Sequence, residues 1–172
     1  MKTQTAAKTS DEVRAILATQ NRPVEIAKIL VPVDFSPASE KSLKYAQRLA
    51  EKFHSELILL HVVEPCSPIP FNALPVTATP EQKTIDAKEN LLELAQSTQV
   101  AEGWKARWNL RTGVATHEIV EGAKELNVDL IVIGAHGFDG WKHFAIGSTA
   151  DRVARAAPCP VLVVREKEHD FI

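Results

Sequence analysis

The chain has 172 residues, a length typical of one globular domain whose core needs neither a disulfide nor a metal. Its 20 Lys and Arg residues stand against 22 Asp and Glu, so the net charge is −2 and no broad basic field is available for nucleic acid or an anionic membrane. The longest apolar runs, LILLHVV and DLIVIGA, are far shorter than the roughly 20 residues that cross a bilayer. We therefore expect neither nucleic acid nor a membrane as a partner.

Residues 1–25 are expected to form an N-terminal extension with one short amphipathic helix in SDEVRAILATQ. Acidic residues in this stretch and the lack of a long apolar segment argue against a targeting leader. The two cysteines, Cys66 and Cys159, lie far apart and match neither a disulfide framework nor a zinc-binding spacing. These features favour a cytoplasmic protein with reduced thiols.

Residues 26–34, IAKILVPVD, form the first predicted strand, and their apolar character on both faces is typical of a parallel sheet. A helix is predicted over 36–53, with Ser36 as its cap and Pro37 at its first position. Residues 56–63 repeat the pattern of a buried strand.

Residues 64–80 contain five of the ten prolines and predict a long loop, which is a candidate surface for a protein partner. Thr79 and Gln82 form a capping box that opens a helix over 80–97. The inward face of this helix is expected to include three apolar residues, Ile85, Leu92 and Ala95.

Residues 104–113, WKARWNLRTG, alternate large apolar and basic residues, which predicts a partly solvated strand near the sheet edge with Arg107 and Arg111 on its solvated face. Trp104 and Trp108 are expected to face the same side and cover the sheet. The later elements are a helix beginning at Thr116, a strand over 128–135, a helix beginning near Thr149 and a final strand over 160–166.

Strand and helix thus alternate five times, which predicts an α/β fold: a five-stranded parallel sheet with helices on both faces, like a Rossmann fold. Ligands of such sheets bind outside the carboxyl ends of the strands.

A glycine segment, GAHGFDGWKHFAIGST, occupies residues 134–149, directly after the fourth predicted strand. Gly134, Gly137 and Gly147, followed by Ser148 and Thr149, fit the spacing G-x2-G-x9-G-S-T. Glycines let a ligand approach backbone amides, and the start of a helix adds free donors and a positive dipole end, so the spacing favours a phosphate site. The alternative is that the glycines only turn the chain tightly between strand and helix.

Several segments together resemble the universal stress protein family: KILVPVDFSPAS, LILLHVV, EIVEGAKELNVDLIVIGAHG and IGSTADRVARAAPCPVLVVRE. The resemblance implies a domain over 26–167 of the adenine nucleotide alpha hydrolase-like type, followed by a tail over 168–172. In the branch that carries this glycine spacing it implies ATP binding. Members commonly form homodimers by pairing their last strands, which here would be residues 160–165.

The resemblance also implies a pocket. Pro32, Val33 and Asp34 would border adenine and ribose, and Val62 would close over the base. Ribose and the α-phosphate would be lined by four residues: Ile133, Gly134, His136 and Gly137. The β- and γ-phosphates would be held by three: Gly147, Ser148 and Thr149. Since proline removes a ladder donor, Pro32 fits a central strand only where pairing stops.

The chain departs from the family pattern after the second glycine, where Phe138 and Asp139 replace a basic residue that many ATP-binding members carry. A carboxylate repels a triphosphate unless a divalent metal intervenes, so we expect Mg²⁺ to accompany ATP. Three other residues are candidates to restore positive charge: Lys142, His143 and Arg152. No protein residue is assigned as a metal ligand.

Four side chains have more than one interpretation. Asp34 is equally a site residue or a cap of the following helix. His136 is a candidate phosphate donor rather than a catalytic base, and His136 with His143 matches no standard metal spacing. His61 is expected to be a hydrogen-bonded core histidine.

Three functions compete. The first is an ATP-binding, dimeric stress-response or signalling module with at most slow hydrolysis, and the second is an ATP-independent interaction module whose nucleotide site has degenerated. The third is a nucleotidyl or phosphoryl transferase, but the sequence shows neither a paired nucleophile and base nor a set of metal carboxylates. No catalytic residue is assigned.

Overall fold

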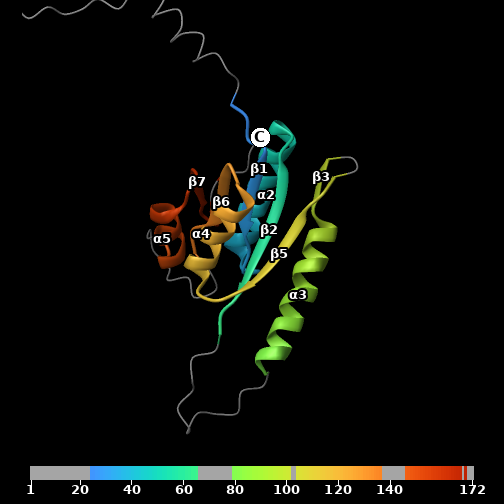
Figure 1. Ribbon diagram of the computed structural model, residues 1–172. Coiled ribbons are helices and arrows are strands. Elements are labelled where there is room, and N and C mark those ends of the chain that lie inside the picture. Colours follow the sequence, from blue (N-terminus) through green and yellow to red (C-terminus); the bar gives the residue numbers. More distant parts are fainter. Residues whose placement is uncertain (1–23, 66–78, 102–103, 137–145, 168, 170–172) are drawn as a thin grey trace, which may run out of the picture.

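The computed structural model describes residues 24–65, 79–101, 104–136, 146–167 and 169. Five parallel strands form one sheet in the order β5-β2-β1-β6-β7 (Figure 1). The first strand, β1, therefore lies at the centre of the sheet. β2 and β5 are added on one side of it, and the chain then crosses back to add β6 and β7 on the other side. The strands are β1 (Lys28–Pro32), β2 (Glu56–Val63), β5 (Arg107–Thr112), β6 (Leu130–Gly134) and β7 (Val161–Val164).

Two helices cover each face of the sheet, and each pair buries its own apolar cluster against the strands. The helices α2 (Pro37–Phe53) and α3 (Pro80–Ser97) share one cluster with alternate strand residues, among them Val31, Leu59 and Val132. The helices α4 (Ala115–Leu126) and α5 (Ser148–Ala156) share the other. Because side chains alternate between faces, strands apolar at every position fill both clusters. The predicted five-stranded α/β architecture is confirmed.

The predicted start of α2 is confirmed: the side chain of Ser36 accepts a hydrogen bond from Ser39 N, and Pro37 occupies the first turn. The cap of α3 is also confirmed, since Thr79 Oγ1 accepts from Gln82 N. The predicted inward face of α3 is wrong in part, because Ile85 is 50% and Leu92 is 38% exposed. The buried stripe instead follows the i, i+4 rows of the helix through Ala87, Leu91 and Ala95.

The predicted strand over 104–113 is not continuous. β4 (Trp104–Lys105) pairs antiparallel with β3 (Gln99–Ala101) in a separate two-stranded sheet, and β5 begins only after the buried Ala106. Trp104 and Trp108 therefore belong to strands of different sheets, so the prediction of one strand that carries both is wrong, and Trp108 is 38% exposed. The position of β5 at the sheet edge is confirmed.

The next helix begins one residue earlier than predicted. It begins at Ala115, and its N-cap Val114 makes no side-chain capping bond. Glu64, at the end of β2, supplies the missing acceptor: its Oε1 takes a hydrogen bond from Ala115 N at 2.8 Å. Since Glu64 is 51 residues away in the sequence, local capping rules do not find it.

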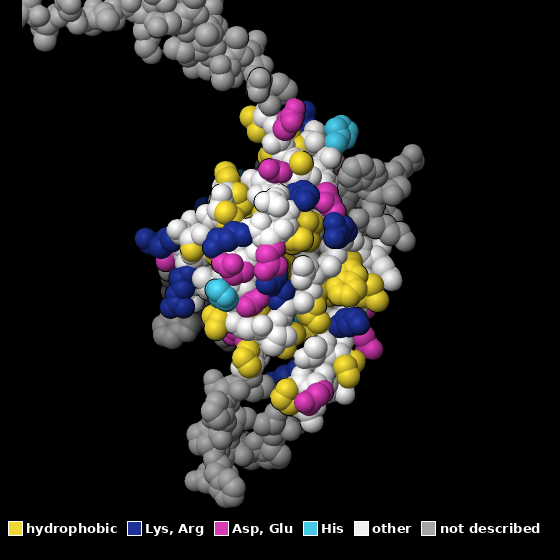
Figure 2. All heavy atoms as spheres, in the orientation of Figure 1, with side chains coloured by type: hydrophobic (Ala, Val, Ile, Leu, Met, Phe, Trp, Pro, Cys, Tyr) yellow, Lys and Arg dark blue, Asp and Glu magenta, His cyan; other side chains and the backbone are white. Residues whose placement is uncertain are grey.

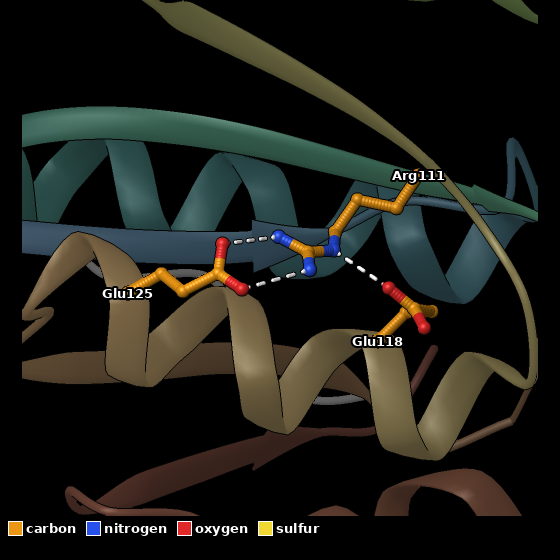
Figure 3. A network of polar contacts seen from close by, with 3 residues as sticks. All are labelled: Arg111, Glu118 and Glu125. Carbon is orange, nitrogen blue, oxygen red and sulfur yellow. Dashed lines mark hydrogen bonds and ion pairs between the residues drawn. The ribbon is translucent and has the colours of Figure 1, made fainter.

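Arg111 does not lie on a solvated face, as the sequence predicted. Its guanidinium donates to Glu118 Oε2 at 2.8 Å and to both carboxylate oxygens of Glu125, so that it lies between two carboxylates of α4 (Figure 3). These bonds raise the pKa of Arg111 and lower that of Glu125. Arg107 is exposed and pairs with Glu56.

Charges of both signs are interleaved over α4 on the face that Figure 2 shows, in agreement with the balanced composition. None of the helices within the described ranges is both long enough and apolar enough to cross a membrane.

Candidate functional site

The carboxyl edge of the sheet opens between β1 and β6. The register of β1 with β2 runs to Pro32 opposite Leu60, whereas its register with β6 ends at Leu30 opposite Ile131. Val33 N–H donates to Leu60 O at 2.8 Å, and because successive residues of a strand alternate between neighbours, the N–H that Pro32 lacks would have pointed at β6. Proline therefore stands where pairing with β6 stops, as expected. This is the turning point of the fold, where doubly wound sheets bind ligands.

Two helix N-termini flank the end of β6. A Cβ on Gly134 would lie 2.9 Å from the carbonyl carbon of Ala38, so the first turn of α2 passes directly against this strand end. On the other side, Gly147 N–H donates to Ala135 O at 2.7 Å and fixes the start of α5 there. A Cβ on Gly147 would lie 2.9 Å from the same Ala135 oxygen. Close backbone packing thus explains both glycines, and neither has a positive φ.

The helix N-termini differ in their acceptors. Ser36 caps α2, Thr79 caps α3 and the Glu64 carboxylate binds the first amide of α4. In the part of the chain that the structure describes, no side chain accepts a hydrogen bond at the start of α5, whose N-cap is Gly147. Its first amides and the hydroxyls of Ser148 and Thr149 therefore form a set of donors with a positive dipole end.

The turn between β1 and α2 is tightly bonded. Asp34 Oδ1 accepts from Ser36 N at 3.0 Å and from Ser36 Oγ, which confirms that Asp34 supports the helix start. Phe35 adopts φ 63°, a left-handed conformation that costs a bulky residue about 1–3 kcal/mol and persists only where surrounding contacts enforce it. Its ring lies 4.8 Å from that of His61, and His61 Nδ1 lies 2.7 Å from Val33 O. His61 is thus hydrogen-bonded, as expected, but it is half-buried and not a residue of the core.

The described members of the predicted pocket all lie at the ends of β1, β2 and β6 or at the start of α5. Pro32, Val33 and Ile133 are buried, so their side chains contribute to the core. Ser148 is exposed, and the partly exposed members are Asp34, Val62, Gly134, His136, Gly147 and Thr149.

Some predicted residues lie outside the described ranges, so their places are not assigned: Gly137, Phe138, Asp139, Lys142 and His143. Most of the predicted loop over 64–80 lies outside them too. Within the described ranges, no cluster of three His, Cys, Asp or Glu side chains is suited to hold a metal ion.

The sequence did not reveal the left-handed conformation of Phe35, its contact with His61, or the hydrogen bond that Glu64 accepts from Ala115. No local pattern signals these features, because they depend on neighbours from a different strand or helix.

Comparison with known proteins identifies the family. The model of the universal stress protein family matches residues 25–165. The universal stress protein MJ0531 of Methanocaldococcus jannaschii is 36% identical over 146 residues, which cover 83% of this chain and 84% of that protein. The structure of the universal stress protein UspA from Lactobacillus plantarum is 28% identical, covers 83% of this chain and 100% of its own, and superposes with a TM-score of 0.69.

Two further structures share the fold and were solved with adenine nucleotides. A universal stress protein in complex with cAMP has a TM-score of 0.62 at 20% identity, covering 86% of this chain and 100% of its own. The universal stress protein from Archaeoglobus fulgidus in complex with dAMP has a TM-score of 0.57 at 23% identity, covering 83% and 99%. With a family model and a relative that each match most of its length, this chain belongs to the universal stress protein family.

Proposed function

We propose that this chain binds an adenine nucleotide, with ATP and Mg²⁺ as the preferred ligand, at the carboxyl edge between β1 and β6. The observation that carries the proposal is the start of α5, which lies at the topological switch point of the sheet and presents donors for which the described residues supply no side-chain acceptor. A stress-response module that responds to nucleotide occupancy is the function that this site supports best.

The phosphates would lie at α5. Backbone amides at a helix N-terminus attract anions through both hydrogen bonds and the helix dipole. The hydroxyls of Ser148 and Thr149 add donors, and His136, half-buried at the end of β6, is a further candidate donor. Gly134, Gly137 and Gly147 complete the expected phosphate side. When bound, Mg²⁺ would neutralise part of the phosphate charge.

The nucleoside would extend from α5 across the open end of β1. Asp34, half-buried in the turn after β1, offers a carboxylate to a ribose hydroxyl. Val62, half-buried at the end of β2, offers an apolar contact to the base. The related structures solved with cAMP and dAMP support an adenine nucleotide in particular.

Dimerisation is proposed through β7. This strand forms one edge of the sheet, and its residues Val161, Leu162 and Val163 are only partly buried in the single chain. An apolar edge strand with unpaired backbone groups is a template for pairing with a second copy. Nucleotide occupancy would then be communicated through α5, which follows the proposed phosphate site and leads into β7.

One observation favours the ATP-independent alternative. Gly134 and Gly147 are both required by backbone packing, so the glycine spacing by itself does not demand a ligand. In that case the module would bind a protein partner, for example at the loop over 64–80, without regard to nucleotide.

The proposal is tested by isothermal titration of the purified protein with MgATP and MgGTP, together with mass spectrometry of any ligand released on denaturation. We expect adenine nucleotide to be released and MgATP to bind more tightly than MgGTP. Ser148→Ala should weaken MgATP binding, while the exposed Ser97→Ala on α3 serves as the matched control. If no adenine nucleotide is released on denaturation and MgATP does not bind in the titration, the proposal is contradicted and the alternative is favoured.

A further inference from the structure

We infer that His61 is a positioning residue for the nucleoside half of the ligand, acting through the turn Val33–Ser36. It would set the affinity for base and ribose and leave the affinity for the phosphates unchanged. The inference rests on the proposed nucleotide site. It gives His61, which is not itself proposed to contact the ligand, an indirect part in the specificity of that site.

The first support is a hydrogen bond that extends the pairing of β1 with β2. His61 Nδ1 lies 2.7 Å from Val33 O, and since a carbonyl oxygen only accepts, Nδ1 carries the proton. Val33 N–H in turn donates to Leu60 O at 2.8 Å. Two successive residues of β2 therefore hold both polar backbone groups of Val33, the last residue before the turn.

The second support is the conformation of Phe35. Among described residues other than glycine, only Phe35, His54 and Asn127 have a positive φ. His54 and Asn127 are the C-caps of α2 and α4, where a left-handed residue is common. Phe35 ends no helix, and its ring is held against His61 at 4.8 Å with the planes inclined by 42°. His61 thus contacts the residues on both sides of Asp34.

The third support is the layout of the sheet. β1 lies between β2, which carries His61, and β6, whose end adjoins the start of α5. A change at His61 therefore reaches the Asp34 turn directly, whereas the donors at the start of α5 lie beyond β1 and the end of β6. Loss of the His61 contacts would let Asp34 move while α5 stays in place.

The test compares two isosteric variants with two ligands in isothermal titrations. The amide nitrogen of Asn lies near the place of Nδ1, whereas that of Gln lies near Nε2, so His61→Asn keeps the donor to Val33 and His61→Gln removes it. The two probes are MgATP and magnesium tripolyphosphate, which lacks the nucleoside. We expect His61→Gln to bind MgATP about tenfold more weakly, the loss that accompanies one hydrogen bond, with tripolyphosphate affinity within about twofold of wild type. His61→Asn should restore most of the MgATP affinity.

Equal weakening of both ligands, or no weakening of MgATP, would overturn the inference while leaving the proposed function standing. If the wild type binds neither ligand, the proposed function fails and the inference fails with it. A measurement on the unmodified chain covers the case that His61→Gln does not fold. The ring nitrogen signals of His61 should report a protonated Nδ1 and shift with MgATP but not with tripolyphosphate, and the opposite pattern would overturn the inference.

Discussion

The first turns of α2 and α5 lie on the two sides of the end of β6, yet they are built in opposite ways. At α2, Ser36 caps Ser39 N and is itself held by Asp34, so side chains of the chain satisfy the helix start. At α5, the N-cap is Gly147 and the described residues supply no side-chain acceptor. The backbone amides at the start of α2 are thus bonded to a neighbouring side chain, whereas the described residues leave those at the start of α5 as donors for a ligand.

This difference indicates how the fold separates stability from binding. A capped terminus contributes about 1 kcal/mol to stability and leaves fewer amides for a ligand. An uncapped terminus gives up that contribution and keeps the amides available. Both helix starts lie close to the end of β6. Among the described residues a side-chain acceptor is present at α2 and absent at α5, so closeness to this strand end does not explain the difference.

The largest expected effect concerns Gly134, which lies between the two helix starts. A Cβ there would meet the Ala38 backbone at 2.9 Å, and because backbone of a helix cannot move aside easily, Gly134→Ala should lower the free energy of unfolding by about 2–3 kcal/mol. Gly122→Ala is the matched control, since its Cβ would meet side chains and not backbone, the nearest being the tip of Leu60 at 2.8 Å, and alanine favours helix. Urea denaturation of both variants should show a large loss only for Gly134→Ala, and equal losses would contradict this packing argument.

Replacement of Ser36 and of Ser148 by alanine tests the difference between the starts of α2 and α5. Ser36→Ala removes the cap of α2 and should lower the free energy of unfolding by about 1 kcal/mol. Ser148→Ala removes an exposed hydroxyl that makes no capping bond within the described ranges, so stability should stay within about 0.5 kcal/mol of wild type. Thermal denaturation without ligand measures both. A loss for Ser148→Ala as large as that for Ser36→Ala would show that α5 is capped after all.

The sequence was sufficient where the determining contacts are local. Ser36 and Pro37 lie next to the helix that they start, and Pro32 marks the place where a strand loses a partner. Apolar runs with β-branched residues predicted four strands of the main sheet, β1, β2, β6 and β7, and the alternation of apolar and basic residues predicted the edge strand β5.

The sequence was insufficient where partners come from other elements. Arg111 resembles a solvated residue of an alternating strand, and only the packing of α4 on β5 brings Glu118 and Glu125 to it. The start of α4 is a second case: the sequence predicted a helix beginning at Thr116, but α4 begins at Ala115, whose N–H donates to the Glu64 carboxylate from the end of β2. The strain at Phe35 has no signal of its own, since it depends on His61 of the neighbouring strand.

The smallest expected effect concerns the ion pair between Arg111 and Glu125 of α4, which lies away from the starts of α2 and α5 and serves as a reference. Arg111 lowers the pKa of Glu125 below its ordinary value of 4.5, so the stabilising contribution of this ion pair is present above that pH and is lost as the pH falls through the folded pKa. Glu125→Gln should therefore be less stable than wild type at about pH 7, and the difference should be smaller at about pH 3. Urea denaturation at the two pH values measures it, and a difference that is undiminished in acid would contradict the assignment.

The central claim is that the open start of α5 receives the phosphates, and Ser148→Asp tests it most directly. A carboxylate at the first position of α5 favours the helix dipole, so we predict that stability without ligand rises by about 0.5 kcal/mol. It also occupies the donors and repels phosphate, so we predict that MgATP binds at least about tenfold more weakly in isothermal titration. Asn90→Asp, which adds the same charge on the exposed face of α3, should bind like wild type. Undiminished MgATP affinity in Ser148→Asp would contradict the claim.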